Sequence, residues 1–523
     1  MTRNPQVTET DETSDQAEVI AFLSDPASYP GVVRSVEVVE THAALVFLTE
    51  QEAFKIKKAV TFPYLDFGTL EKRAAACDYE LQINQPHAPD IYLGVAKITR
   101  EASGELAING AGEPVECALH MWRFPDNALL GDVIRAKGLT PEFVDRLADE
   151  IGRYQAEAPI ARDDHAAGRM AAIVDELCVA FDEAAGMLPA DEAHRFEKSA
   201  KAALRQCRVL LDDRGRQGYV RRCHGDLHLS NIIILNNQPV LFDAIEFNDE
   251  IATVDILYDL AFLLMDLGHI GEDGYANRLF NRYLSQSAND DHLAGLQALP
   301  LFMACRAGVR AMVAVTRLQQ SSGRTAQSSE TAAEAGSYLL EATAYLAPRP
   351  PRLIAVGGLS GTGKTSLARA LAAQIARCPG AVHLRTDVER KQMFGVSETT
   401  RLPKQSYTPE ARDAVYERMV QKATVALRAG HAVIVDAIFL DLAARSAVEQ
   451  VAEKTGASFA GLWLEADEQQ LVERVNSRKD DASDATADVV RQQLKQSTGP
   501  VTWHRINANG ALEETVERSL QAL

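Results

Sequence analysis

The stretch from Gly358 to Thr365 reads GLSGTGKT, which matches G-x-x-x-x-G-K-[ST] and strongly limits the fold around it. It follows the apolar run LIAV at 353–356, which predicts a strand, and it precedes an amphipathic pattern that predicts a helix. In such a strand–loop–helix, backbone N–H groups curl around phosphate oxygens and the helix N-terminus adds positive potential. The sequence therefore predicts a phosphate-binding loop at the carboxyl end of a strand.

We expect this loop to bind the triphosphate of ATP together with Mg²⁺. Lys364 is predicted to reach the β- and γ-phosphates as a catalytic residue, and the Thr365 hydroxyl is predicted to be a metal ligand. The other residues expected to bind the nucleotide are Gly358, Ser360, Gly361, Thr362, Gly363 and Ser366. An accidental glycine-rich turn would not explain the strand and helix signals on its two sides.

Beyond residue 350, apolar runs alternate with helical patterns. The strand-like runs are LIAV, VHLR, VIVD, FAGLWLE and VTWHRI. This alternation predicts an α/β domain in which a parallel sheet is covered by helices on both faces. The segment APRPP at 347–351 cannot continue a helix, because proline lacks the backbone N–H. We therefore place a linker at 346–351 and a P-loop NTPase kinase domain at 352–523.

Two acidic residues stand at predicted strand ends of this domain. Asp387 follows VHLR, and Asp436 ends VIVD. Ligands of open α/β sheets collect at the carboxyl ends of strands, so we predict that Asp387 deprotonates an acceptor hydroxyl and that Asp436 holds the magnesium shell. Arg474 and Arg478 lie four residues apart on one helix face and are predicted to close over the transferring phosphoryl group. For each, the alternative is a solvated surface charge or a helix cap.

Four segments of the second half resemble P-loop kinases that phosphorylate hydroxyl groups, a group that includes gluconate kinases, polynucleotide 5′-kinases and zeta toxins. The segments are GLSGTGKT, LRTDVERK at 384–391, AVIVDAIF at 432–439 and RVNSRKDDASDA at 474–485. The resemblance implies that Asp387 is the base acting on the acceptor. A nucleic-acid end kinase stays open as an alternative, supported by a basic group made of Arg385, Arg390, Lys391, Arg401 and Lys404.

A second polar cluster lies in CHGDLHLSNIII at 223–234. His224, Asp226 and Asn231 have the H-x-D-x-x-x-x-N spacing of a kinase catalytic loop, in which the Asp accepts the hydroxyl proton and the Asn holds magnesium. The runs IIIL and VLFD follow as a hairpin, and Asp243 then takes the place of the metal-binding Asp of D-F-G. Asp, Asn, Ser and Gly also make ordinary turns, but a turn alone does not require this spacing.

The segment AFKIKK at 53–58 supplies lysines on a predicted strand. Because strand side chains alternate, Lys55 and Lys57 share one face and Lys58 takes the other. We favour Lys57 as the lysine that binds the nucleotide phosphates. Glu80, on a helix predicted from Thr69 to about residue 85, is its expected ion-pair partner. A surface charge is the alternative for both residues.

The remaining patterns of the first half predict a two-lobed α+β domain. The runs SVEVVE, AALVFLT, AFKIKK, IYLGVAKI and ECALHMW indicate a small sheet. Helical patterns dominate beyond residue 139, beginning at the start signal Thr140-Pro141-Glu142. We expect a disordered or extended segment at 1–19, a small lobe at 20–122 and a helical lobe at 123–345.

The first half, about 20–345, resembles the aminoglycoside phosphotransferase group of the protein-kinase-like fold. HGDLHLSN, FDAIEF and YDLAFLLMDL at 258–267 carry this resemblance, which implies that Asp259 supports the catalytic loop. The sequence lacks G-x-G-x-x-G between residues 33 and 49, so phosphate cover must come from other backbone groups. The whole chain is similar to proteins described as bifunctional aminoglycoside phosphotransferase/ATP-binding proteins.

Composition narrows the partners and the compartment. With 54 basic and 73 acidic residues the net charge is −19, so no global field attracts nucleic acid or anionic lipid. Seven cysteines without a C-x-x-C pair argue against a disulfide framework or a zinc site. The polar, acidic N-terminus is unlike a signal peptide, and no run approaches 18 apolar residues. We expect a cytoplasmic protein without a membrane partner.

The expected function is ATP-dependent phosphotransfer to a hydroxyl group at two magnesium-dependent sites, with a small-molecule acceptor as the first choice. In the main alternative, one half is a non-catalytic ATP sensor that regulates the other. Nucleic acid as a partner is disfavoured by the negative charge but stays open. The sequence does not identify the acceptor, the oligomeric state or any coupling between the halves.

Overall fold

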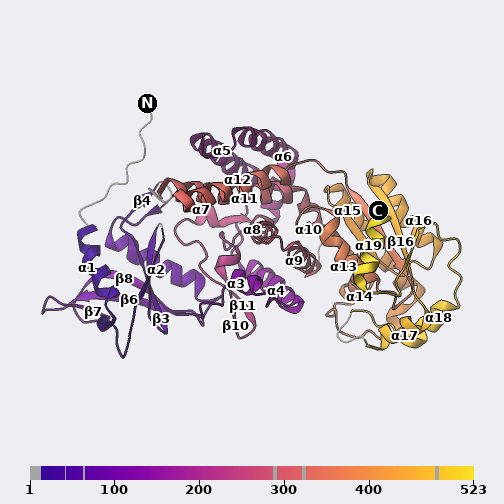
Figure 1. The fold of residues 1–523 in the computed structure, drawn as a ribbon, viewed down its shortest axis with the longest axis horizontal. Helices are drawn as coiled ribbons and strands as arrows, with labels where there is room; N and C mark the ends of the chain where they lie inside the picture. The colour runs from indigo at the N-terminus through magenta and orange to yellow at the C-terminus, as the bar shows by residue number, and fades with distance from the viewer. Residues whose placement is uncertain (1–12, 42, 63–64, 287–290, 321–324, 478–481) are drawn as a thin grey trace. The chain divides into compact units, whose positions relative to one another are not determined.

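The computed structural model describes residues 13–41, 43–62, 65–286, 291–320, 325–477 and 482–523 (Figure 1). The chain forms two compact units. The first contains residues up to 162 together with 218–259, and the second contains 163–217 together with 260–523. The unit boundary therefore does not coincide with the proline-rich segment near residue 350, although helix α12 ends at Tyr345 and strand β13 begins at Arg352.

An antiparallel sheet of six strands forms the small lobe of the first unit. Its strand order is β1-β2-β3-β8-β6-β7. These strands are β1 (Glu37–Glu40), β2 (Ala44–Leu48), β3 (Glu52–Lys57), β6 (Tyr92–Arg100), β7 (Leu106–Ile108) and β8 (Glu113–Trp122), and the short strands β4 (Thr61–Phe62) and β5 (Leu65–Asp66) pair separately. The alternating runs predicted all of the six except β7.

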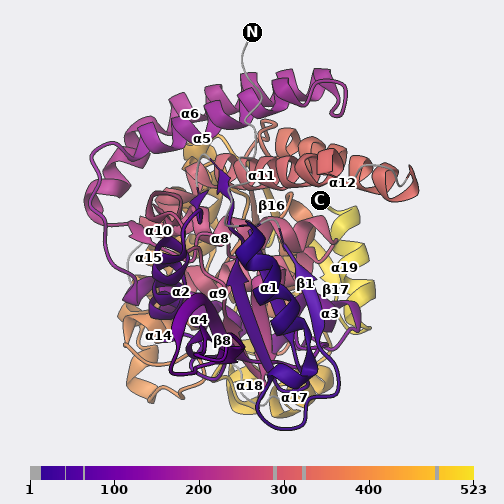
Figure 2. The same cartoon turned by 90° about the vertical axis from the view of Figure 1, so that its left-hand side faces the viewer.

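Two helices accompany this sheet. Helix α2 (Leu70–Asn84) begins where predicted, because the Thr69 hydroxyl caps it by accepting from the Lys72 N–H. Helix α1 (Thr13–Ser24) lies against the sheet (Figure 2) and precedes the short η1 (Pro26–Ser28). The expectation of a disordered or extended segment up to residue 19 is therefore wrong from Thr13 onward. Val19 and Leu23, one helical turn apart, bury their side chains in the core of the lobe.

The rest of the first unit surrounds the H-x-D segment. Its elements are α3 (Leu130–Arg135), α4 (Pro141–Glu157), β9 (Val220–Arg222), η2 (Leu229–Asn231), β10 (Ile232–Leu235), β11 (Gln238–Leu241), α7 (Asp249–Ala252) and β12 (Thr253–Asp255). The predicted hairpin is confirmed, since β10 and β11 pair antiparallel with Ile232 opposite Leu241. The Phe242 N–H donates to the Asn231 oxygen at 3.1 Å, so the residues that flank the hairpin stay together at its open end.

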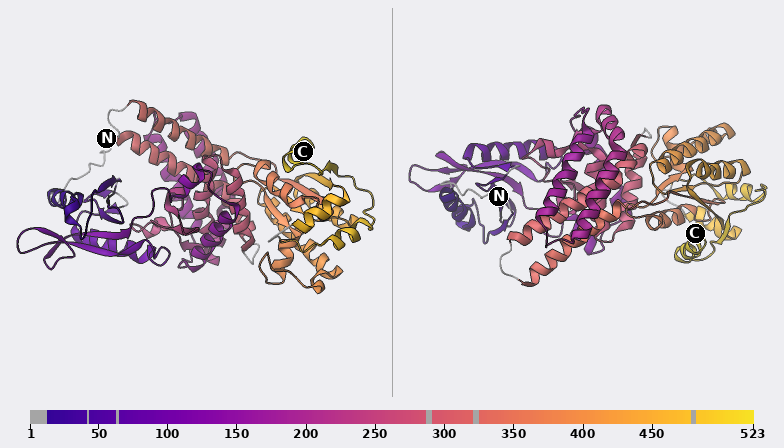
Figure 3. Two further views of the ribbon diagram at one scale, coloured as in Figure 1. Left: turned by 60° about the horizontal axis from the view of Figure 1, so that its bottom comes forward. Right: turned by 90° about the horizontal axis from the view of Figure 1, so that it is seen from above.

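Helices dominate the N-terminal part of the second unit. They are α5 (Ala166–Glu183), α6 (Ala190–Gln217), α8 (Ile256–His269, whose first turn belongs to the first unit), α9 (Asp273–Gln286), α10 (Asp291–Gly295), η3 (Leu296–Ala298), α11 (Leu299–Gln320) and α12 (Thr325–Tyr345). Helices α11 and α12 run side by side (Figure 3). The run Asp291–Gln319 is long and apolar enough to cross a membrane by length and composition, but 72% of its most apolar window is buried, as in a core helix.

A parallel sheet of five strands, in the order β14-β15-β13-β16-β17, forms the core of the C-terminal part. The strands are β13 (Arg352–Gly358), β14 (Val382–Arg385), β15 (Val433–Asp436), β16 (Ser458–Glu465) and β17 (His504–Asn507). The helical elements are α13 (Lys364–Ile375), α14 (Thr386–Met393), η4 (Lys404–Tyr407), α15 (Pro409–Arg428), α16 (Leu442–Thr455), α17 (Glu468–Ser477), α18 (Ala487–Leu494) and α19 (Leu512–Gln521). Helices α13 and α19 pack together over one face of the sheet, while α15 and α16 pack over the other. This confirms both parts of the predicted fold class.

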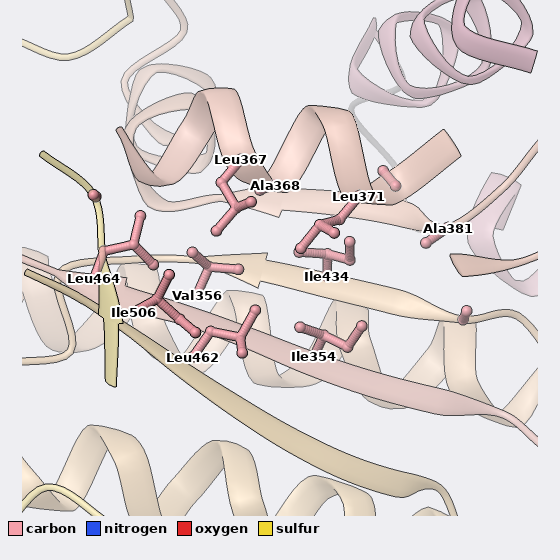
Figure 4. Close-up of a cluster of buried hydrophobic side chains, with 13 residues drawn as sticks. Ile354, Val356, Leu367, Ala368, Leu371, Ala381, Ile434, Leu462, Leu464 and Ile506 are labelled. Atoms are coloured by element: carbon pink, nitrogen blue, oxygen red, sulfur yellow. The ribbon is translucent and has the colours of Figure 1, made fainter. Parts of the chain in front are cut away.

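Apolar side chains from both layers fix helix α13 on the sheet. Leu367 and Leu371, one turn apart on α13, point toward Val356 and Ile434 of the central strands (Figure 4). All four are fully buried. Burial of large aliphatic side chains stabilises a fold by about 1.5–3 kcal/mol each. This packing holds the first turn of α13, and therefore the loop before it, in a fixed position relative to the strand ends.

Helix α9 explains why the helical segment and the P-loop domain belong to one unit. Strand β14 is at the edge of the sheet and leaves one row of backbone groups without a neighbouring strand. Asn281 of α9 accepts from the His383 N–H at 2.7 Å and donates to the Ala381 oxygen at 3.1 Å. Asn277 donates to the oxygens of Pro379 and Ala381 at 2.7 and 3.0 Å. Two asparagine side chains thus take the place of a neighbouring strand.

Candidate active sites

The loop between β13 and α13 has the backbone of a phosphate cradle. Gly358, Gly361 and Gly363 all have positive φ angles, which L side chains rarely adopt. At Gly361 a side chain is also excluded sterically, because a β-carbon would lie 2.5 Å from the Leu471 oxygen. The loop therefore requires these glycines in order to approach a ligand closely with its N–H groups.

The lysine and threonine at the end of the loop lie where the sequence places them. Thr365 Oγ1 donates to Asp436 Oδ2 at 2.5 Å. Lys364 Nζ donates to the Leu359 oxygen within the loop at 2.8 Å. The two segments meet because β13 and β15 are adjacent parallel strands, with Val356 opposite Asp436. Of the other predicted loop residues, Thr362 donates to the Leu359 oxygen at 2.8 Å, whereas Ser366 is exposed on α13.

Asp436 is an ionised carboxylate in a buried position. Burial would raise its pKa, but His383, Lys364 and Arg385 outweigh this effect and hold the pKa at about 2. Burial lowers the pKa of His383, whose Nε2 lies 3.7 Å from Asp436 Oδ2, so this imidazole is neutral near pH 7. The stabilising charge therefore comes from Lys364 and Arg385. A stable anion next to the Thr365 hydroxyl offers two hard oxygen ligands for Mg²⁺.

Asp387 lies in the first turn of α14, directly after the edge strand β14. Burial raises the pKa of its carboxyl, Arg385 opposes this rise, and Asp436 adds to it. A carboxyl with a raised pKa can accept a proton near neutral pH more readily than an exposed one. The raised pKa fits the role of a base, which stays a prediction.

Three of the five residues in the predicted basic group are buried, while Arg401 is exposed. Arg385, Arg390 and Lys391 are 8%, 6% and 1% exposed. Arg390 donates to the Ser406 oxygen at 3.0 Å, and Lys391 donates to the Thr400 oxygen and to Asp484. The side chain of Lys404 lies outside the described residues. These interactions are structural, and they weaken the case for a nucleic-acid surface.

Of the two predicted arginines, Arg474 lies beside the loop. A β-carbon built on Gly363 would be 4.0 Å from Arg474 Nη1, and Arg474 Nη2 donates to the Gly510 oxygen at 3.2 Å. Arg478 lies outside the described residues. The structure therefore bears on only one of the two positions.

Gln493 of α18, which is not among the predicted site residues, also supports the loop. Its Oε1 accepts from the Ser360 N–H at 2.9 Å, and its Nε2 donates to Ser360 Oγ at 3.1 Å. Both residues are buried. No motif signals this contact, because the partners are 133 positions apart.

We expect Gln493→Leu to weaken nucleotide binding at the P-loop about tenfold, because the buried Ser360 N–H would lose its partner and the loop its support. Titration of the full-length protein with a non-hydrolysable ATP analogue would measure the change. Gln492→Leu is a matched control, since Gln492 is exposed on the same helix. Equal affinities of the two variants would show that Gln493 does not hold the loop.

The H-x-D segment of the first unit brings Asp226 and Asn231 together. Asn231 Nδ2 donates to Asp226 Oδ2 and to the Asp226 backbone oxygen, both at 2.9 Å. Asp259, which is fully buried, accepts from the Gly225 N–H at 2.9 Å. His228 Nε2 lies 3.3 Å from Asp226 Oδ2. Asp259 of α8 thus holds the backbone of the loop at Gly225, while Asn231 and His228 contact the carboxylate of Asp226.

His224 links this loop to the segment that carries Asp243. Its Nε2 contacts the Phe242 oxygen at 2.9 Å. Burial lowers the pKa of His224, so it is a neutral donor near pH 7. Asp243 itself has a φ of 59°, which is uncommon for a residue other than glycine, and its N–H donates to Tyr92 Oη at 3.0 Å. The hairpin and this hydrogen bond hold Asn231 and Asp243 at the same end of the site.

Both lysines of β3 reach the carboxylate of Glu80 on α2. The structure brings together the predicted pair Lys57 and Glu80, and the second partner of Lys57 is Glu246. Lys55 bridges Glu80 at 2.9 Å and Asp243 at 2.6 Å. Burial would raise the pKa of Glu80, but the two ammonium groups outweigh it and keep this carboxyl ionised. Lys55 therefore adjoins the candidate metal ligand, which sequence alternation alone did not indicate.

The donor atoms of both sites suit magnesium. Asn231 and Asp243 offer amide and carboxylate oxygens, and Thr365 and Asp436 offer hydroxyl and carboxylate oxygens. Within the part of the chain that the structure describes, no three His, Cys, Asp or Glu side chains form a metal site by themselves.

Two family models match the chain. Residues 128–299 match the phosphotransferase enzyme family, and residues 353–500 match an AAA domain. The protein named Uncharacterized protein Rv2004c of Mycobacterium tuberculosis is 30% identical over 490 residues, which cover 92% of this chain and 94% of the relative. These matches confirm the resemblance expected from the motifs of both halves.

Solved structures match parts of the chain. A gluconokinase from Sinorhizobium meliloti is 22% identical and covers 33% of this chain and 92% of its own, with a TM-score of 0.25. A choline/ethanolamine kinase family protein from Mesorhizobium loti is 14% identical and covers 64% of this chain and 99% of its own, with a TM-score of 0.36.

Proposed function

The chain belongs to the family of bifunctional aminoglycoside phosphotransferase/ATP-binding proteins, and from this premise we propose that it has two ATP-dependent phosphotransferase centres. Each centre transfers the γ-phosphoryl group of ATP to a hydroxyl group of a small molecule. The proposed compartment is the cytoplasm. The family itself does not establish aminoglycosides as the acceptors.

One arrangement carries the proposal, and it occurs in both units. In each site a lysine ammonium group and oxygen donors suited to magnesium lie beside a carboxylate that can act as a base. In the first unit these groups are Lys55, Asp243 and Asp226. In the second they are Lys364, Asp436 and Asp387. Phosphoryl transfer needs this combination, because charge must be neutralised while the acceptor is positioned and deprotonated.

The protein side chains have separate tasks in this proposal. Asn231 and Asp243 would hold Mg²⁺ in one unit, and Thr365 and Asp436 would hold it in the other. The bound ion would screen the charge of the triphosphate. Asp226 and Asp387 accept the proton of the acceptor hydroxyl at their carboxylate oxygens. Arg474 places its guanidinium group beside the phosphate loop, where it adds positive charge.

For the first unit we assign the phosphate contact to Lys55 in place of Lys57. The side chain of Lys55 is 14% exposed and already lies against Asp243, whereas that of Lys57 is 2% exposed and held by two carboxylates. Each lysine has two carboxylate partners, but only Lys55 has the candidate metal ligand Asp243 as one of them. If Lys57 turned toward a ligand, it would leave buried carboxylate charge unpaired. Lys55 can exchange Asp243 for a phosphate oxygen when the metal takes over that carboxylate.

Titration of the full-length protein with a non-hydrolysable ATP analogue and Mg²⁺ tests this function. We expect two bound nucleotides per chain in the unmodified protein. Lys364→Ala and Lys55→Met should each remove one of them, because each variant deletes the phosphate-binding cation of a single site. Lys454→Met, at an exposed position of α16, should retain both.

A screen of ATP consumption over sugars, aminoglycosides, nucleosides and oligonucleotides would then identify the acceptors. Two centres predict that the two variants lose different acceptor activities. If either variant alone removed all turnover, one half would be a nucleotide sensor instead of an enzyme. Absence of bound nucleotide in the unmodified protein would contradict the proposal as a whole.

A further inference from the structure

The first unit contains a chain of five charged groups, which is longer than the phosphate contact of Lys55 requires. The chain runs from Asp243 through Lys55, Glu80 and Lys57 to Glu246. Asp243 and Glu246 belong to the same segment after β11, so the chain closes on itself. Glu80 is fully buried, and the side chains of Lys57 and Glu246 are 2% and 8% exposed.

Charge pairing gives the second lysine a specific task. An ionised carboxylate that is fully buried is costly unless a cation pairs with it. If Glu80 had Lys55 as its only partner, it would lose part of this pairing whenever Lys55 turned toward a nucleotide phosphate. Lys57 stays beside Glu80 in either case. It also lies over the Phe67 ring at 5.4 Å, which restricts the position of its ammonium group.

The same chain connects helix α2 to the segment that carries the metal ligand. Glu80 and Asn84 are one turn apart on α2. Asn84 accepts from the Ala244 N–H at 2.8 Å, and Glu80 reaches Glu246 through Lys57. Burial and the charge of Glu80 raise the pKa of Glu246, and the ammonium group of Lys57 opposes this rise. Helix α2 thus holds the segment 243–246 at two points.

We propose that Lys57 and Glu246 form a positioning pair that keeps Glu80 and the Asp243 segment in place while Lys55 binds nucleotide. This inference rests on the proposed nucleotide site of the first unit. Two lysines on one face of β3 then have different functions, since Lys55 contacts the phosphates and Lys57 stabilises the surroundings. The pair matters most in the nucleotide-bound state, when Lys55 no longer shares its charge with Glu80 and Asp243.

The test uses the full-length protein with Lys364→Ala, so that only the first unit binds nucleotide. Adding Lys57→Met and Glu246→Gln together removes the pair without leaving either member alone. We expect affinity for a non-hydrolysable ATP analogue to fall at least about tenfold, while the melting temperature of the nucleotide-free protein changes little, because Lys55 still pairs with Glu80 there. A purely structural pair would lower the melting temperature without this selective loss.

Further variants keep the test decisive. Glu246→Gln alone leaves Lys57 paired with Glu80 and should weaken binding of the ATP analogue severalfold. This single variant tests the inference even if the double variant does not fold. Lys57→Arg should retain most of the affinity, and Lys58→Met is the matched control, since Lys58 pairs with the exposed Glu40. Unchanged affinity in the double and single variants would overturn the inference. Absence of binding in the Lys364→Ala parent would overturn the proposed site itself.

Discussion

Replacing Lys364 with alanine should lower kcat/KM of the P-loop activity by at least about 100-fold, the loss typical when one preorganised charge at a reacting phosphate is removed. Lys364 begins helix α13, and its Nζ already points into the loop, 2.8 Å from the Leu359 oxygen. Alanine would remove the cation without disturbing the packing of Leu367 and Leu371 on the sheet. The loss should therefore appear in nucleotide turnover and not in folding.

Steady-state kinetics with the acceptor identified by the screen would measure this loss, and thermal unfolding would verify the fold. Lys454→Ala serves as the control, because it also removes a lysine charge but at an exposed position of α16. If Lys364→Ala kept its activity within a factor of about three, the loop would not be the catalytic phosphate site. Activity assigned to the first unit should persist in this variant.

The P-loop site could be predicted from the sequence because its chemistry is local. GLSGTGKT places the glycines, Lys364 and Thr365 on consecutive residues, and a strand–loop–helix context fixes their directions. Asp436 could be added because parallel strands end at the same edge of a sheet. The structure brings it to Thr365 through pairing of β13 with β15. Gln493 could not be found in this way, since its contact with Ser360 depends on how α18 packs.

The choice between Lys55 and Lys57 in the first unit shows a different limit of prediction from sequence. Alternation along β3 correctly places Lys55 and Lys57 on one face, but it does not tell which carboxylate each will meet. That depends on the segment 243–246, about which strand periodicity says nothing, and on α2. Asp243 could be predicted from its position after a hairpin, whereas Glu246 carries no motif of its own. The distinction between the two lysines thus arises from tertiary pairing.

The division of the chain into units was also beyond the sequence. Composition and the proline-rich segment indicate a boundary near residue 350, and the secondary structure indeed changes there. The compact units divide elsewhere, because Asn277 and Asn281 of α9 bind the edge strand β14. Two polar residues on an amphipathic helix resemble any solvated helix face in the sequence. Experiments on the second unit therefore call for the full chain and not for a fragment that begins at residue 352.

Asp226→Asn should reduce kcat of the first-unit activity by about 10²–10⁴-fold, the range for loss of a general base, with little change in ATP affinity. The substitution removes the proton acceptor but keeps an oxygen that can accept from Asn231 Nδ2. Asp243 and Lys55 are unchanged, so the groups assigned to the metal and the phosphates remain. A fall in kcat with nearly constant KM for ATP is therefore the expected signature.

The matched control is Asp126→Asn, which removes an exposed carboxylate from the same unit and should leave kcat unchanged. Comparison with Lys364→Ala decides whether the centres are independent. Because the two residues lie in different units with separate sets of donor atoms, each variant should lose a different acceptor activity and keep the other. If both variants lost the same activity, the chain would contain one catalytic centre whose turnover needs both nucleotide sites, and the assignment of Asp226 as an independent base would be wrong.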